Sequence, residues 1–93
     1  MMNQVSAENV GIRALGWIAA QDEVFAAFLA ASGARVADLR QLAGDPVFLT
    51  AVLDFLLQSD TWVFDFAAEN GLTPETPMQA RMALGGAEGT HFA

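Results

Sequence analysis

The sequence predicts an all-α fold, a single compact bundle of five or six helices. Apolar residues recur at helical spacing in each segment of the chain, and residues typical of helix ends separate the segments. Nowhere do β-branched residues alternate with polar residues over a useful length, as they would in a half-buried strand. The 93 residues suit one domain, which we expect to span residues 6–86, with residues 1–5 and 87–93 as flexible termini.

The first helix is predicted to start with Ser6 as N-cap and to run to about Gln21. Its apolar face consists of Val10, Ala14, Leu15, Trp17 and Ile18. Gly11 and Gly16 would each weaken a helix by roughly 1 kcal/mol relative to alanine. We therefore expect another helix to pack closely against both glycines.

A second helix and a short helical segment follow. Asp22 is the expected N-cap of a helix that reaches Ser32, and Gly33 then stands where a left-handed C-cap residue is expected. Alanines surround the large apolar side chains of this helix and would let another helix approach closely. Between residues 36 and 43, apolar residues recur at every third position, which predicts one or two helical turns ended by Gly44.

The next helix, over residues 45–59, has the clearest start signal in the chain. Asp45 is a carboxylate N-cap, and Pro46 occupies the first helical position. The polar residues inside this helix are Thr50, Asp54 and Gln58. Because they are spaced four apart, they form one narrow stripe, and the rest of the helix surface must be buried. We therefore expect this helix to be central, with two helical hairpins packed around it.

Asp60 is the expected N-cap of a helix that runs to Asn70 and stops at Gly71. Its polar stripe consists of Thr61, Asp65 and Glu69. Its inward face consists of Trp62, Val63, Phe66 and Ala67. The alternation of one polar stripe with one apolar face predicts a helix at the surface of the bundle.

Two Thr-Pro pairs, at residues 73–74 and 76–77, can each start a last helix. Its apolar residues are Met78, Met82 and Leu84. The helix is expected to end at the glycine pair at residues 85–86. The residues that follow show no periodicity, which is why we expect a loose tail there.

A shift of 38 residues brings landmarks of the two halves of the chain into register. The identical pairs are Asp22/Asp60, Gly33/Gly71, Leu15/Leu53, Phe28/Phe66 and Ala30/Ala68. Each half then holds a long helix, an aspartate at the next helix start, a second helix, a glycine stop and a short third helix. Duplication explains this pattern, and so does independent helical packing with shared cap chemistry. Either origin is compatible with two hairpins related by a pseudo-twofold axis.

The segment DPVFLTAVLDFLL, at residues 45–57, resembles the core motif of a family of small, mainly alphaproteobacterial proteins, catalogued as domain of unknown function 3572. Supporting segments are ALGWIA at residues 14–19, FLAASG at 28–33 and RMALGG at 81–86. The resemblance implies a small all-helical intracellular domain with no assigned activity, so no functional residue is carried over. This chain departs from the family pattern between Gly33 and Gly44, where it lacks a proline near the start of the segment.

The composition excludes several classes of partner and chemistry. Eleven acidic residues against four arginines give a formal net charge of −7. Nucleic acids and anionic lipids require clustered basic residues, so we expect neither as a partner, whereas a basic protein would be attracted. Without cysteine, the chain has no disulfide and no thiolate nucleophile. The longest apolar run has eight residues and the N-terminus lacks a signal-peptide pattern, so we expect a soluble cytoplasmic protein.

Few residues qualify for catalysis or ligand binding, and we expect no metal and no cofactor. The single histidine, His91, lies in the expected tail. Asp22, Asp45 and Asp60 could suggest a cation site, but helix capping explains each of them. Asp54 is the more interesting acid. It can mark the solvent edge of its helix, pair with an arginine, or serve acid–base chemistry.

These observations favour a non-enzymatic interaction module that associates with itself or with a partner protein through an alanine-rich or aromatic helix face. The candidate surface residues are Trp17, Ala27, Ala31, Trp62, Asp65 and Glu69. The tryptophans can instead anchor the core, and the two acids can be an ordinary solvated face.

Two further functions stay open. The first is a carrier or sensor that binds an apolar small molecule between the hairpins. The residues expected to line its cavity are Phe55, Phe64, Met78 and Met82. The second is a carboxylate-based enzyme that uses Asp54 or Asp65.

Overall fold

The computed structural model describes the backbone of residues 2–89 and the side chains of residues 2–85. The elements are α1 (Gln4–Ala19), α2 (Asp22–Ser32), a 3-10 turn (Val36–Asp38), α3 (Leu39–Leu42), α4 (Pro46–Leu56), α5 (Asp60–Asn70) and α6 (Thr76–Gly89). Because residues 2–89 contain helices and no strand, the all-α prediction is confirmed. The helical region extends a few residues beyond the expected bounds of 6 and 86 at both ends.

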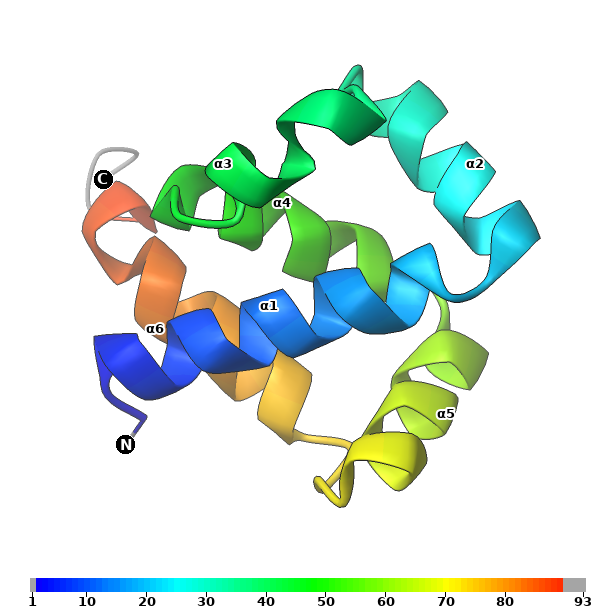
Figure 1. Cartoon of the computed structure of the whole chain (residues 1–93). Coiled ribbons are helices and arrows are strands. Elements are labelled where there is room, and N and C mark those ends of the chain that lie inside the picture. The colour runs from blue at the N-terminus through cyan, green and yellow to red at the C-terminus, as the bar shows by residue number, and fades with distance from the viewer. Residues whose placement is uncertain (1, 90–93) are drawn as a thin grey trace.

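Three helices, α1, α4 and α6, pack on one another and enclose the core, while α2 and α5 lie on the same side of them, apart from each other (Figure 1). Ile18 from α1, Leu53 from α4 and Ala80 from α6 are fully buried in this core. The helix expected to be central, over residues 45–59, is buried in this core as α4, and α1 and α6 share the core with it. Helix α6 shares that place because small residues such as Ala80 let it approach closely, and small residues give a weak apolar signal in the sequence.

The polar stripe predicted along α4 is also different from the observed one. Thr50 is buried, and its hydroxyl donates to the Pro46 carbonyl at 3.0 Å, so it needs no contact with solvent. Asp54 and Gln58 are exposed as expected. Val47, 62% exposed, lies on the solvent side instead of Thr50. The exposed face of α4 is thus rotated toward Val47, because a threonine can satisfy its own hydroxyl within the helix.

Three of the predicted helix-end residues are confirmed. Asp45 caps α4 by accepting from the Val47 amide at 2.9 Å, with proline at the start of the helix. Gly33 and Gly71 follow α2 and α5 in the left-handed conformation, at φ of 73° and 66°. Glycine adopts this backbone conformation without the strain that a Cβ atom would cause.

The N-caps predicted at Ser6, Asp22 and Asp60 are wrong by one to three residues. The residues observed at those positions are Asn3, Gln21 and Ser59. The Asn3 side chain accepts from the Ser6 amide at 2.8 Å, and the Ser59 hydroxyl accepts from the Trp62 amide at 3.3 Å. Asp22 and Asp60 lie in the first helical turn, where a carboxylate still interacts favourably with the helix dipole.

The two glycines of α1 differ in their surroundings. A Cβ placed on Gly11 would lie 3.0 Å from the Cβ of Leu49, so α1 and α4 come this close only because Gly11 has no side chain. A Cβ placed on Gly16 would meet nothing within 4 Å. Close packing is therefore confirmed at Gly11 and wrong at Gly16.

The last helix begins at the second Thr-Pro pair, where the hydroxyls of Thr73 and Thr76 share a hydrogen bond of 2.8 Å. The stop predicted at residues 85–86 is wrong, because neither glycine adopts the left-handed conformation and α6 continues to Gly89. Gly85 has a different role. A Cβ at this position would collide with the guanidinium of Arg81, so the glycine provides room for that side chain.

The first two helices of each half repeat one geometry at the shift of 38 residues, whereas the expected short third helix is short only in the first half, because α6 has 14 residues. Helices α2 and α5 occupy equivalent residues, 22–32 and 60–70. The bend from α1 to α2 is 118°, and the bend from α4 to α5 is 114°. The pairing of two similar hairpins, predicted from five identities, is thus visible in the backbone.

Aromatic contacts follow the same repeat and cross between the halves. Trp17 of α1 meets Phe66 of α5 edge to face, with ring centroids 6.4 Å apart, and Phe28 of α2 meets Phe55 of α4 edge to face at 5.3 Å. Adding 38 to the numbers of Trp17 and Phe28 gives those of Phe55 and Phe66, so one contact is the counterpart of the other. Each half places its long-helix aromatic residue against the second helix of the other half.

Candidate functional site

Helix α2 is an apolar helix that buries little of its surface. Eight of its 11 residues are apolar, yet only Phe28 is fully buried. Its exposed alanines are Ala26, Ala27, Ala30 and Ala31. No residue from 24 to 34 has a charge, although the chain as a whole has a net charge of −7. Beyond the exposed Asp22 and Glu23 of its first turn, the outer face of α2 is therefore an uncharged, apolar stretch on an acidic molecule.

The equivalent face of α5 provides an internal comparison. Ala27 and Ala31 correspond, 38 residues later, to Asp65 and Glu69, and all four are exposed. Helix α5 thus has carboxylates on the side where α2 has methyl groups. Four of the six predicted surface residues form two equivalent pairs on two different helices, and the fold does not bring them into one site.

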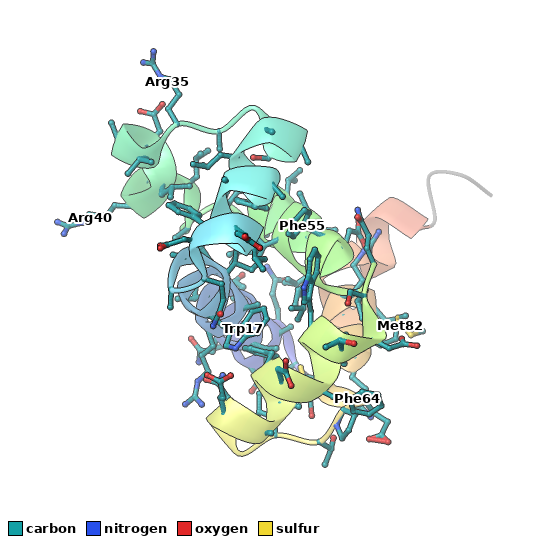
Figure 2. All side chains as sticks on the ribbon, turned by 90° about the vertical axis from the view of Figure 1, so that its right-hand side faces the viewer. Trp17, Arg35, Arg40, Phe55, Phe64 and Met82 are labelled. Atoms are coloured by element: carbon teal, nitrogen blue, oxygen red, sulfur yellow. The ribbon has the colours of Figure 1, made fainter. Side chains whose placement is uncertain are left out.

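The two tryptophans predicted as surface candidates lie inward. Trp17 is 8% exposed, and its indole N–H donates to Glu69 Oε2 at 3.0 Å (Figure 2). Trp62 is half-buried and stacks on Phe55, with ring centroids 5.0 Å apart. Trp17 is therefore part of the core, and Trp62 packs at the edge of the core. Glu69 is therefore a hydrogen-bond acceptor for Trp17 as well as a surface carboxylate.

Seven large apolar side chains of the described residues are exposed, and three of them, absent from the predicted surface, belong to α5 and α6. Phe64 of α5 is 57% exposed, and Met78 and Met82 of α6 are 48% and 67% exposed. Figure 2 shows Phe64 and Met82 on one side of the molecule, far from Arg35 and Arg40 at the opposite end. Of the four residues expected to line a cavity, these three are therefore exposed, whereas Phe55 is buried and lines a depression between α2 and α4.

For Phe64, the sequence contains a signal that could have predicted its exposure to solvent. It lies next to Asp65 and one helical turn from Asp60, on the polar side of α5. The methionines offer no such signal, because Met78 and Met82 face away from the core only as a result of how α6 docks on α1 and α4.

Asp54 and Arg81 form an ion pair that joins α4 to α6, with the arginine Nε as donor. This is one of the roles that the sequence left open for Asp54. The Asp54 side chain is 53% exposed, so the pair lies at the solvent edge of the core. The Arg81 side chain reaches the carboxylate by passing over Gly85.

Among the open depressions on the described surface, two lie next to α3 and α2. The larger, about 580 Å³, lies beside α3 and is lined by small and polar residues that include Arg35, Asp38 and Gln41. The smaller, about 200 Å³, lies between α2 and α4, and its lining includes Phe28, Phe55 and Asp54. Neither is an enclosed apolar cavity between the hairpins.

The chemical groups at the surface are mainly carboxylates in contact with solvent. Every acidic side chain among residues 2–85 is exposed except Glu8, which is half-buried. That part of the chain contains no cluster of three or more potential metal ligands, and His91 lies outside the described residues. Within the same limits, no single helix is long and apolar enough to cross a membrane; only the two bent pairs α1–α2 and α4–α5 reach such a length.

The comparison with protein families agrees with the motif at residues 45–57. The family described as "Protein of unknown function (DUF3572)" matches residues 4–87, which is nearly the whole chain. The chain belongs to the DUF3572 family. The match extends over all six helices and over both halves of the internal repeat, so the whole bundle is the DUF3572 domain. No curated protein and no solved structure matches the chain.

Proposed function

We propose that this protein is a non-enzymatic interaction module that pairs with a second copy of itself through the outer face of α2. The observation that supports the proposal is the mismatch between the composition of α2 and its burial. A helix with eight apolar residues out of 11 buries one of them fully. Association would remove more of this apolar surface from water.

Charge favours a second copy as the occupant of this face. Two chains with a net charge of −7 repel each other, so a surface that has few carboxylates favours their association. The stretch from residue 24 to residue 34 meets that condition, whereas the corresponding face of α5 contains Asp65 and Glu69. In a two-fold dimer the same face occurs on both sides of the contact, so any carboxylate on this face would be present on both subunits and would repel its own copy.

The small size of the exposed residues also suits helix pairing. Alanine side chains let the backbones of two helices approach closely, and they lose no side-chain entropy on burial. Because a single short helix on each side buries a modest area, we expect a weak dimer that depends on concentration.

The test compares two equivalent substitutions, Ala30→Glu on α2 and Ala68→Glu on α5. Both alanines are exposed, and they occupy the same position of their helices. Light scattering over a range of concentrations, supported by native mass spectrometry, should give twice 9.9 kDa for the unmodified chain and for Ala68→Glu, and 9.9 kDa for Ala30→Glu. Circular dichroism checks that both variants stay folded.

Two outcomes would contradict the proposal. One is an unmodified chain that stays monomeric at the highest concentration reached. The other is an equal loss of association in Ala30→Glu and Ala68→Glu, because that would indicate a general effect of added charge and not a contact through α2.

No specific observation favours the other two functions. A carrier of apolar small molecules is expected to have a pocket of roughly 300 to 1,000 Å³ with an apolar lining. The depression beside α3 has that size, about 580 Å³, but its lining includes charged side chains such as Arg35 and Asp38. The aromatic depression between α2 and α4 has only about 200 Å³. An enzyme that uses two carboxylates is expected to hold them in different environments, whereas Asp54 and Asp65 are both exposed.

A further inference from the structure

We infer that Phe64, Met78 and Met82, which we name the α5–α6 apolar surface, bind a cationic amphipathic helix of another protein. This inference goes beyond the proposed self-association, because it concerns a different face and a different class of partner. It depends on two independent observations: large apolar side chains are exposed there, and the charged side chains of α5 and of the segment after it are all carboxylates.

The apolar part of this surface comes from two helices in contact. Helices α5 and α6 pack on each other and are joined by the short segment of residues 71–75. Met78 and Met82 are one helical turn apart and face the same way, and Figure 2 shows Met82 and Phe64 on the same side of the molecule. Methionine side chains are flexible and polarisable, so a surface of this kind adapts well to the side chains of a docked helix.

The electrostatic part comes from α5 and the segment after it. Its exposed carboxylates are Asp60, Asp65, Glu69 and Glu75. No basic residue occurs between Arg40 and Arg81, and Arg81 is paired with Asp54. The field near the α5–α6 apolar surface is therefore negative and not balanced by any cation on α5.

This combination determines the class of partner. A negative field repels phosphate backbones, anionic lipids and a second acidic copy of this chain, and it attracts a cationic segment. The exposed apolar side chains require apolar residues on that segment as well. A helix that has lysine or arginine on one side and leucine-like residues on the other meets both requirements.

The probe for the test is a synthetic amphipathic helix of leucine and lysine, with a matched peptide that has glutamate in place of every lysine. Calorimetric titration of the full chain should detect binding of the lysine peptide, with an affinity that falls as salt is added. The glutamate peptide should bind at least about tenfold more weakly, which corresponds to 1.4 kcal/mol.

Two matched variants locate the binding surface. The double substitution Phe64→Ser with Met82→Ser should weaken binding of the lysine peptide by about tenfold. Val36→Ser is the control, because Val36 is exposed to a similar degree, 62%, but lies in the turn before α3 at the other end of the molecule. The affinity of this control for the lysine peptide should stay within about twofold of the unmodified chain.

Equal affinity for the lysine and glutamate peptides would overturn the inference, and so would equal losses in the double variant and in Val36→Ser. The failure of the proposed self-association would look different. Ala30→Glu is designed to disrupt pairing through α2, and it should leave the affinity for the lysine peptide unchanged. The two claims can therefore fail separately.

Discussion

At the scale of single residues, the two glycines of α1 show how a residue type can be required at one position and dispensable at another. Gly11 lies where α1 meets α4, with Leu49 filling the space that a side chain would need. Gly16 lies at an exposed position with no neighbour in reach of a Cβ. Their substitution by alanine should therefore change stability in opposite directions.

We predict that Gly16→Ala raises the free energy of unfolding by up to about 1 kcal/mol, since alanine favours the helix more than glycine does. Gly11→Ala should lower it by about 1 kcal/mol or more, because the shift forced on Leu49 exceeds the gain in helix propensity. Urea denaturation followed by circular dichroism measures both. Similar stabilisation by the two substitutions would contradict the close contact between α1 and α4.

A second residue-scale prediction concerns the start of α5. Ser59→Ala should cost about 1 kcal/mol, because it removes the acceptor for the Trp62 amide. Asp60→Ala should cost less, roughly 0.3 to 1 kcal/mol, since only the interaction with the helix dipole is lost. Denaturation in low and high salt separates them, because screening weakens the dipole effect and leaves the cap hydrogen bond nearly unchanged. A larger loss of stability for Asp60→Ala than for Ser59→Ala would indicate that Asp60 is the N-cap.

These positions also show what the sequence could reveal at this scale. Gly33 and Gly71 were predictable because the left-handed conformation has few alternatives to glycine. The N-caps were not, because adjacent polar residues such as Ser59 and Asp60 can both serve. Which of them becomes the cap depends on the backbone path into the helix, and tertiary packing determines that path.

At the scale of helices, the contact between α4 and α6 depends on three residues that act together. Asp54 accepts from Arg81, and Arg81 reaches it because Gly85 leaves room. An added methyl group at residue 85 would displace the guanidinium. The glycine therefore influences the α4–α6 contact through a side chain of its own helix.

A double-mutant cycle should show this coupling. Gly85→Ala gains helix propensity but loses the ion pair, which at an exposed site is worth about 0.2 to 1 kcal/mol. In an Asp54→Asn background there is no ion pair to lose, so the same substitution should be more favourable by that amount. Chemical denaturation of the four proteins gives the coupling energy. A value near zero would mean that Arg81 contributes nothing through Asp54.

Helices were easier to predict than the faces they expose. The order of helices followed from apolar spacing, and α2 was predicted with its end at Ser32 and its start within one residue. The role of α6 in the core was missed because its contacts use small residues such as Ala80. The exposure of Met78 and Met82 depends on how α6 docks, and one sequence contains no measure of docking direction.

At the scale of the whole molecule, the two halves depend on each other. The contacts of Trp17 with Phe66 and of Phe28 with Phe55 both cross from one half to the other. The core itself is formed by α1 from the first half and by α4 and α6 from the second. Neither half holds a complete core.

We therefore predict that fragments 1–44 and 45–93 have little helix when separate and regain it when mixed. Circular dichroism of each fragment and of the equimolar mixture measures this, and the melting curve of the mixture should be cooperative. Cooperative melting of fragment 45–93 alone would contradict the prediction. The mutant fragment with Phe66→Ala is a useful control, because it should complement fragment 1–44 poorly.

The divergence of α2 and α5 has a consequence for the valency of the molecule. A chain built from two similar halves could have two equivalent association surfaces. Repeated pairing through both surfaces would produce open filaments. Asp65 and Glu69 stand on α5 where α2 has Ala27 and Ala31, so only one of the two surfaces is suited to pairing with a copy. Under the proposed self-association, growth therefore stops at two subunits. The acidic surface of each subunit stays available for a partner of another kind.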